Sequence, residues 1–275
     1  MVRRGMRGTG FRRGLANLYT ATNLNRVCHL VHSKIVRLLF ALLLPGIAQA
    51  TCAIAVWTPE KIVLGADSME RVINPENNGG AVNQCKIQQA GNYYVMVSGI
   101  TSHRRTGFDT FAIIAASIRQ SDSVFEAADL AMNEVERGFM NVLVSAKDTD
   151  GRYIANLELN SPTFAIAGFE RGRPQMVYCS FDKIRGRWTW TRDDYPNARQ
   201  GGIAYAYLCG QRGINFYKRG HPNWRREDPV RTVAGMIAAE ARSVPREVGG
   251  PLALVILDRG GAHWRSGGVC GSPDR

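Results

Sequence analysis

The first 50 residues contain no aspartate or glutamate, although they hold eight basic side chains of a chain whose formal net charge is +12. Those eight are Arg3, Arg4, Arg7, Arg12, Arg13, Arg26, Lys34 and Arg37. Beyond residue 50 the chain has 27 basic and 23 acidic residues, so it is close to neutral. Because the excess charge is confined to the N-terminal part, it indicates a targeting segment and argues against a nucleic-acid partner.

Metal-binding and nucleotide-binding patterns are also missing. The chain has six cysteines and five histidines without C-x-x-C spacing, and it lacks a Rossmann glycine fingerprint and a phosphate-binding loop. We therefore expect no metal and no cofactor. The cysteines after residue 50 are odd in number, so at least one thiol stays unpaired or bridges two molecules: Cys52, Cys85, Cys179, Cys209 and Cys270.

The apolar run from Ile35 to Ala48 is shorter than the roughly 20 residues that a membrane-spanning helix needs, and Pro45 interrupts it. Lys34 precedes the run, and Ala48-Gln49-Ala50 ends it. A positive flank, a short apolar core and an A-x-A site are typical of a cleavable secretory signal. The sequence therefore predicts an exported protein, periplasmic or secreted, that signal peptidase cleaves after Ala50.

We accordingly expect a targeting segment at residues 1–50, with its core at 31–50, and one folded domain at residues 51–275. An uncleaved signal that anchors the protein in a membrane is the alternative for localisation, and an Arg-rich organellar transit peptide is another. The segment before residue 31 is long for a signal. No methionine lies between Met6 and Met69, so a non-methionine start near Leu30 is a further hypothesis.

Alternating and helix-periodic segments predict the fold class. Strand pairs are expected at 52–58 with 62–66 and at 84–89 with 93–98, helices at 108–119 and 124–146, strands at 153–157, 163–169 and 175–181, a helix at 229–244 and a strand at 252–257. Strand pairs followed by helices and then further strands favour an α+β fold. We expect two antiparallel sheets covered by helices, a four-layer αββα sandwich.

Thr51 is the residue that cleavage after Ala50 would expose at the N-terminus. A threonine hydroxyl is a weak nucleophile until a base removes its proton, and an adjacent free α-amine can be that base. The reference pKa of an α-amine, about 7.7 to 8.0, is close to working pH. Before cleavage Thr51 has only an amide nitrogen, so removal of the leader would activate it.

Two charged residues are expected to support this nucleophile. Asp67 follows the second strand of the first hairpin, where its carboxylate can lie beside the beginning of the first strand. Lys86 stands in an otherwise strand-like run, where a long charged side chain needs solvent or a partner. A pair with Asp67 would satisfy Lys86, and the cation would lower the pKa of the Thr51 amine. Taken singly, a turn carboxylate and an exposed edge-strand lysine are the simpler interpretations.

These segments together resemble the N-terminal part of a proteasome β-type subunit, a family in the N-terminal-nucleophile hydrolase superfamily. The resemblance covers residues 51–101 through four phrases: Thr51-Cys-Ala-Ile-Ala-Val-Trp, Ile62-Val-Leu-Gly-Ala-Asp-Ser68, Cys85-Lys-Ile87 and Val97-Ser-Gly99. It implies Thr51 as nucleophile, with Asp67 and Lys86 as its supports. It also implies that the backbone N–H of Gly99 donates to the oxyanion of the tetrahedral intermediate.

The stretches that should correspond to the family's supporting serine and Asp-Ser residues depart from the pattern. They read Cys209-Gly-Gln-Arg-Gly213 and Arg246-Glu-Val-Gly-Gly-Pro251, and neither holds a serine. The leading hypothesis is an exported threonine hydrolase that cleaves a peptide or small amide substrate. The alternatives are a weakly active or inactive structural or binding module of the same fold, and a Cys52 nucleophile freed by cleavage one residue later. Assembly into a homo-oligomer is implied by the resemblance alone.

Overall fold

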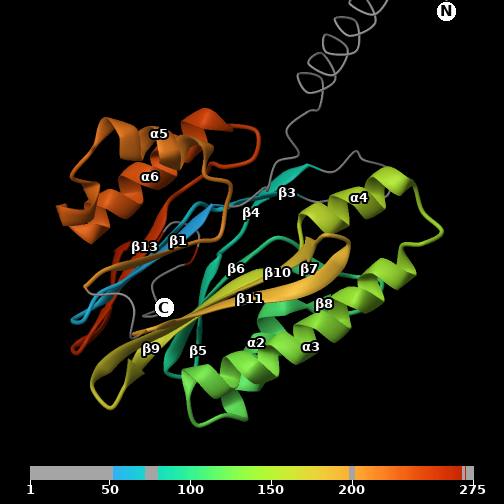
Figure 1. Cartoon of the computed structure of the whole chain (residues 1–275), viewed down its shortest axis with the longest axis horizontal. Coiled ribbons are helices and arrows are strands. Elements are labelled where there is room, and N and C mark those ends of the chain that lie inside the picture. Colours follow the sequence, from blue (N-terminus) through green and yellow to red (C-terminus); the bar gives the residue numbers. More distant parts are fainter. Residues whose placement is uncertain (1–51, 72–79, 198–201, 268–269, 271–275) are drawn as a thin grey trace, which may run out of the picture. The chain divides into compact units, whose positions relative to one another are not determined.

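The structure is a computed structural model that describes residues 52–71, 80–197, 202–267 and 270. All of these residues belong to the compact unit that spans Ala48–Arg275 (Figure 1). Thr51 and the predicted targeting segment lie outside the described residues. None of the described helices has the length and apolar character needed to span a membrane.

The first sheet has five strands, each antiparallel to its neighbour. The strands Ala53–Trp57 and Ile62–Ala66 contain only glycine and apolar residues and are buried throughout, as expected for strands covered on both faces. In spatial order the strands are β12 (Ala204–Tyr207), β1 (Ala53–Trp57), β2 (Ile62–Ala66), β13 (Ala253–Asp258) and β14 (Gly261–Ser266).

The second sheet also has five antiparallel strands. In spatial order they are β11 (Arg187–Tyr195), β10 (Arg173–Ile184), β9 (Thr163–Glu170), β6 (Tyr93–Ser98) and β5 (Ile87–Ala90). Two small pairs accompany the sheets, namely β3 (Met69–Arg71) with β4 (Ala81–Asn83), and β7 (Ser102–His103) with β8 (Phe108–Asp109).

The described part of the chain contains five α-helices, and four of them begin at a side-chain cap that the sequence carries. Asp109, Ser123, Asp150 and Asp228 each accept a hydrogen bond from the first turn of their helix, which satisfies amides that have no partner inside the helix. The helices are α2 (Thr110–Arg119), α3 (Val124–Ser145), α4 (Gly151–Leu159), α5 (Arg212–Gly220) and α6 (Pro229–Ser243), with a short 3₁₀ turn, η1, at Trp224–Arg226.

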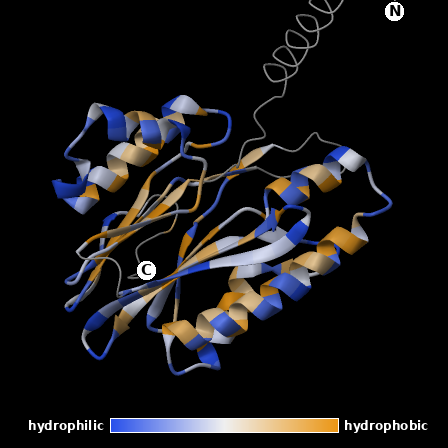
Figure 2. Ribbon diagram, viewed as in Figure 1, coloured by the Kyte–Doolittle hydropathy of each residue, from blue (hydrophilic) through white to orange (hydrophobic). Residues whose placement is uncertain are grey.

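Three separate groups of buried apolar side chains hold the layers together. One group lies between the two sheets and includes Leu64 of β2 and Met96 of β6. A second, with Phe139 of α3 and Phe181 of β10, joins the second sheet to α2 and α3. The third joins the first sheet to α5 and α6, and includes Val233 of α6. Hydrophobic and hydrophilic residues are interspersed along α3, as a helix packed on one side requires (Figure 2). The molecule is therefore the expected αββα sandwich.

Most predicted elements are confirmed, but the prediction of a strand at 153–157 is wrong, because these residues lie in α4. Asp150 caps that helix by accepting a hydrogen bond from the Arg152 amide at 3.0 Å. Tyr153 and Leu157, four residues apart, are both buried on one side of it. A short apolar segment is compatible with the periodicity of a strand or of a helix, and here the Asp150 cap favours the helix. The helix expected from Phe108 begins at Thr110, because Phe108 and Asp109 pair as β8.

Phe139 provides a test of the second core. It is fully buried, and its ring contacts the rings of Phe108, Phe181 and Trp188. We expect Phe139→Ala to lower the free energy of unfolding by about 3–5 kcal/mol through the cavity it leaves. Phe216→Ala is the control, since Phe216 is 71% exposed and its loss should change stability by about 0.5 kcal/mol or less. Urea unfolding followed by circular dichroism measures both, and equal effects would contradict this packing.

Candidate active site

Antiparallel pairing brings several strand ends together at one end of the first sheet. Ala53 at the start of β1 lies opposite Ala66 at the end of β2, and Ala66 lies opposite Ala253 at the start of β13. Residues just outside these strands, including Cys52 and Asp67, therefore gather at one edge although they are far apart in sequence.

Asp67 is 2% exposed and accepts three hydrogen bonds at this edge. Its Oδ1 accepts from the Cys52 amide at 2.8 Å and from Lys86 Nζ at 2.7 Å, while its Oδ2 accepts from the Gly249 amide at 2.9 Å. The amide of Asp67 in turn donates to the carbonyl of Cys52 at 2.9 Å. The expectation that Asp67 lies beside the beginning of the first strand is confirmed.

Lys86 is 3% exposed, so the interpretation as an exposed edge-strand lysine is wrong. It lies one residue before β5, and its ammonium donates to Asp67 Oδ1 and to the carbonyl oxygen of Met69. The predicted ion pair between Lys86 and Asp67 is present. A lysine can be buried here because a carboxylate and a carbonyl compensate its charge.

Burial has opposite effects on the two members of the pair. Removal from water raises the pKa of the Asp67 carboxyl, against the effects of Lys86 and of the amides of Gly249 and Cys52. It lowers the pKa of the Lys86 ammonium, against the effect of Asp67. Each group stays charged only because the other is in place, so the pair behaves as one unit.

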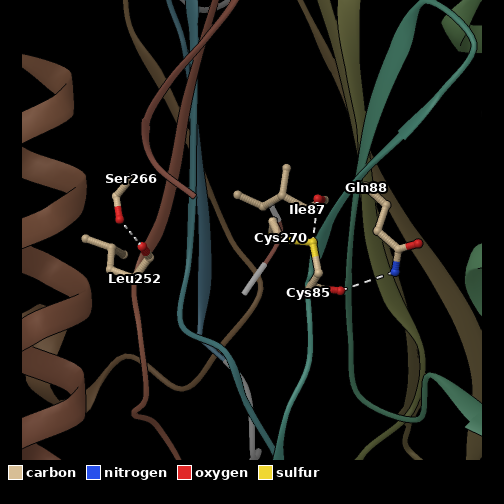
Figure 3. Close-up of a disulfide and its surroundings, with 6 residues drawn as sticks. All are labelled: Cys85, Ile87, Gln88, Leu252, Ser266 and Cys270. Atoms are coloured by element: carbon tan, nitrogen blue, oxygen red, sulfur yellow. Dashed lines mark hydrogen bonds between the residues drawn. A yellow bond between two sulfur atoms is a disulfide. The ribbon is translucent and has the colours of Figure 1, made fainter. Parts of the chain in front are cut away.

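The disulfide between Cys85 and Cys270 stands directly beside Lys86 in the chain (Figure 3). It joins the segment before β5 to the segment after β14 across 185 residues, with a Cα to Cα distance of 4.6 Å. The carbonyl of Cys85 also accepts a hydrogen bond from Gln88 Nε2 at 3.2 Å. This crosslink ties the backbone that carries Lys86 to the far end of the chain.

Gly99 lies one residue after β6, a strand of the second sheet. Lys86, one residue before β5, lies at the same end of that sheet. Its φ is +80°, a conformation that disfavours side chains, and a Cβ added there would lie 2.1 Å from the carbonyl oxygen of Ser161. Glycine is thus required at this position. Its expected role as an oxyanion donor stays a prediction, as do the catalytic roles of Thr51, Asp67 and Lys86.

The backbone groups that Gly249 contributes to the site were not foreseen. Gly249 donates its amide to Asp67, and its carbonyl accepts from the amides of Ser68 and Met69 at 3.2 and 3.1 Å. Gly249 belongs to the stretch from Arg246 to Pro251, which contains no serine. Any residue except proline can donate a main-chain hydrogen bond, so side-chain patterns did not single out the amide of Gly249.

Cys52 does not have the properties of a reactive thiol. It is fully buried, and burial raises the pKa of its thiol well above the ordinary value, whereas nucleophilic cysteines have lowered pKa values. This observation disfavours the Cys52 alternative. Among the described residues, no three His, Cys, Asp or Glu side chains are grouped so that they could hold a metal ion.

No protein family and no curated protein matches the sequence. Among solved structures, the chain is similar to the Anbu (Gly-1) mutant from Hyphomicrobium sp. strain MC1, with 15% identity and a TM-score of 0.49 over 78% of this chain and 88% of that chain. A similarity of this degree assigns neither activity nor substrate. The candidate site is therefore defined by the contacts within this chain alone.

Replacement of Lys86 tests the buried pair. Lys86→Met leaves the Asp67 carboxylate buried without its cation, so the free energy of unfolding should fall by about 3–5 kcal/mol at neutral pH. Lys183→Met is the matched control, because Lys183 pairs with Glu158 at 2.6 Å but is partly exposed, and its loss should cost about 0–1 kcal/mol. Urea unfolding of both variants measures the difference.

The same variant should show a defined pH dependence. Without Lys86 the folded-state pKa of Asp67 rises further above its unfolded value. A carboxyl group shifted in this direction favours the folded state below the unfolded pKa and loses that contribution as the pH rises through the folded pKa. The stability difference between Lys86→Met and the wild type should therefore narrow as the pH falls toward about 3.9. A difference that stays constant with pH would contradict the assignment.

Proposed function

We propose that this chain is an exported hydrolase that cleaves amide or peptide bonds with Thr51 as its N-terminal nucleophile. The observation that carries the proposal is the buried pair of Lys86 and Asp67, in which Asp67 Oδ1 accepts from the amide of the residue that follows Thr51. The αββα architecture and the resemblance to proteasome β-type subunits support it. Peptides or small amides are the proposed substrates.

Maturation supplies the base. Hydrolysis of the peptide bond after Ala50 converts the amide nitrogen of Thr51 into a free amine. An ammonium group has three N–H donors, and Asp67 and Met69 account for two of those of Lys86. We assign the third to the Thr51 hydroxyl. The nearby positive charge lowers the pKa of the Thr51 amine, so more of it is present as the free base at neutral pH.

The reaction then proceeds through an ester. The amine takes the hydroxyl proton as Thr51 Oγ attacks the substrate carbonyl, and the amide N–H of Gly99 donates to the oxyanion that forms. The amine returns the proton to the leaving nitrogen, and the carbon–nitrogen bond breaks. The same amine deprotonates a water molecule, which attacks the ester carbonyl. The bond from the carbonyl carbon to Thr51 Oγ then breaks, Oγ takes the proton back from the amine, and the acid is released. A preorganised oxyanion donor contributes about 3–4 kcal/mol to such a reaction.

A structural or binding module is the second candidate. It is favoured by the absence of serine from the stretches 209–213 and 246–251, where the family places supporting residues. On this alternative the buried ion pair organises the strand ends without catalysis. The two candidates differ in whether the residue at position 51 becomes acylated.

Acylation of Thr51 is the decisive experiment. Protein recovered from the exported fraction should begin at Thr51 on N-terminal sequencing, and a β-lactone probe should add one acyl group at that residue, seen by mass spectrometry. Thr51→Ser should label more slowly, and Thr51→Ala should not label. Thr189→Ala is the control, because Thr189 is an exposed threonine of β11 and its loss should leave labelling unchanged.

Two results would refute the proposal. One is a mature N-terminus at another residue. The other is equal labelling of wild type and Thr51→Ala, which would leave the non-catalytic module as the better account of the fold.

A further inference from the structure

Cys52 and Cys209 are 157 residues apart in sequence, yet their Sγ atoms lie 2.7 Å from each other. Cys52 precedes β1, and Cys209 follows β12, its neighbour at the edge of the first sheet. Both side chains are buried, with exposed fractions of 0% and 8%. The pair lies at the same end of the sheet as Asp67, and the Cys52 amide donates to Asp67.

The sheet register places the two cysteines directly opposite each other. Ile54 pairs with Tyr207, and the amide of Leu208 donates to the carbonyl of Ala53 at 2.8 Å. Since Ala53 and Leu208 are a hydrogen-bonded pair, the next pair outward, Cys52 with Cys209, is a non-hydrogen-bonded one. Residues of such a pair have Cα atoms about 4.5 Å apart, with their side chains close together. That spacing falls within the range of about 4.4–6.8 Å that disulfides adopt.

A separation of 2.7 Å is too short for two independent thiols. Non-bonded carbon atoms rest about 3.5–4.0 Å apart, and sulfur is larger than carbon, so two thiols at this distance repel each other. A thiol is also only a weak hydrogen-bond donor, which cannot offset such an overlap. Formation of a covalent bond removes the repulsion.

We propose that Cys52 and Cys209 form a second structural disulfide, which closes the β1–β12 edge of the sheet at the residue that follows Thr51. With the crosslink between Cys85 and Cys270, it pairs four of the five cysteines after residue 50. The fifth, Cys179, is fully buried in the second core and would remain a thiol. The odd number of cysteines then needs no bridge between molecules.

Formation of the bond requires an oxidant, which we assign to the class of disulfides, such as oxidised glutathione. One cysteine loses its proton and attacks the oxidant, which forms a mixed disulfide and releases one thiol. The other cysteine loses its proton and attacks the mixed disulfide, which releases the second thiol. Two electrons pass to the oxidant, and its two sulfurs take up the two protons. Because both cysteines are buried in the finished fold, the exchange takes place while the strands assemble.

The bond would limit movement of the main chain beside Thr51. Two hydrogen bonds between Cys52 and Asp67 already hold the start of β1 on the side of β2, one donated by the Cys52 amide and one accepted by the Cys52 carbonyl. The disulfide would hold Cys52 on the side of β12. Any effect on catalysis rests on the function proposed above, whereas the bond itself does not.

Disulfide mapping tests the inference without reference to activity. The full chain, folded with oxidised glutathione, is unfolded in denaturant with N-ethylmaleimide, digested without reductant and analysed by mass spectrometry. We expect a peptide containing Cys52 joined to one containing Cys209, and the label on Cys179. Label on both Cys52 and Cys209, or a bond from either to another cysteine, would overturn the proposal.

Three variants serve as controls. Cys179→Ala should leave both crosslinks intact, and Cys209→Ala should expose Cys52 to the label. Thr51→Ala should retain the Cys52–Cys209 crosslink even though it abolishes acylation. A crosslink present in a chain that no probe acylates would uphold this inference while the proposed function fails, so the two outcomes are separable.

Discussion

One buried carboxylate, that of Asp67, connects parts of the chain that sequence keeps far apart. It accepts hydrogen bonds from the amide before β1, from the ammonium before β5 and from the amide of Gly249 before β13. Because β1 and β13 belong to the first sheet and β5 to the second, this single group ties the ends of both sheets together. The geometry of the candidate site depends on that connection.

Burial of the Asp67 carboxylate costs hydration free energy, so only closely fitted partners can stabilise it. A carboxylate or an ammonium removed from water loses a large hydration free energy, and only a well-placed partner offsets the loss. Lys86 and Asp67 provide this for each other, and the carbonyl of Met69 adds a further acceptor. The consequence is a fixed positive charge close to the start of β1. A fixed positive charge lowers the pKa of an amine placed near it.

The sequence predicted those parts of the molecule that depend on local pattern or on side-chain identity. The first hairpin, the helix capped by Ser123 and the helix that begins at Pro229 are confirmed because caps, turns and periodicity act over a few residues. The pairing of Asp67 with Lys86 was also foreseen, because a charged side chain in an apolar strand needs either solvent or a partner of opposite charge. Its depth of burial was not, since burial depends on which segments cover it.

Other features had an ambiguous local signal or none. The segment around Tyr153 was misassigned because a short, mostly apolar run fits both a strand and a helix. The amide of Gly249 and the pairing of Cys85 with Cys270 arise only when distant strands come together. The sequence showed that the cysteines were odd in number, but not which of them would meet.

The central claim is that Asp67 holds the start of β1 and the segment before β13 in place. Amide hydrogen exchange measured by NMR tests it most directly, because the amides of Cys52 and Gly249 both donate to this carboxylate. In Asp67→Ala, exchange at these two amides should accelerate, while the amide of Ile166, in the middle of β9, stays protected. Unchanged protection at Cys52 and Gly249 would contradict the account.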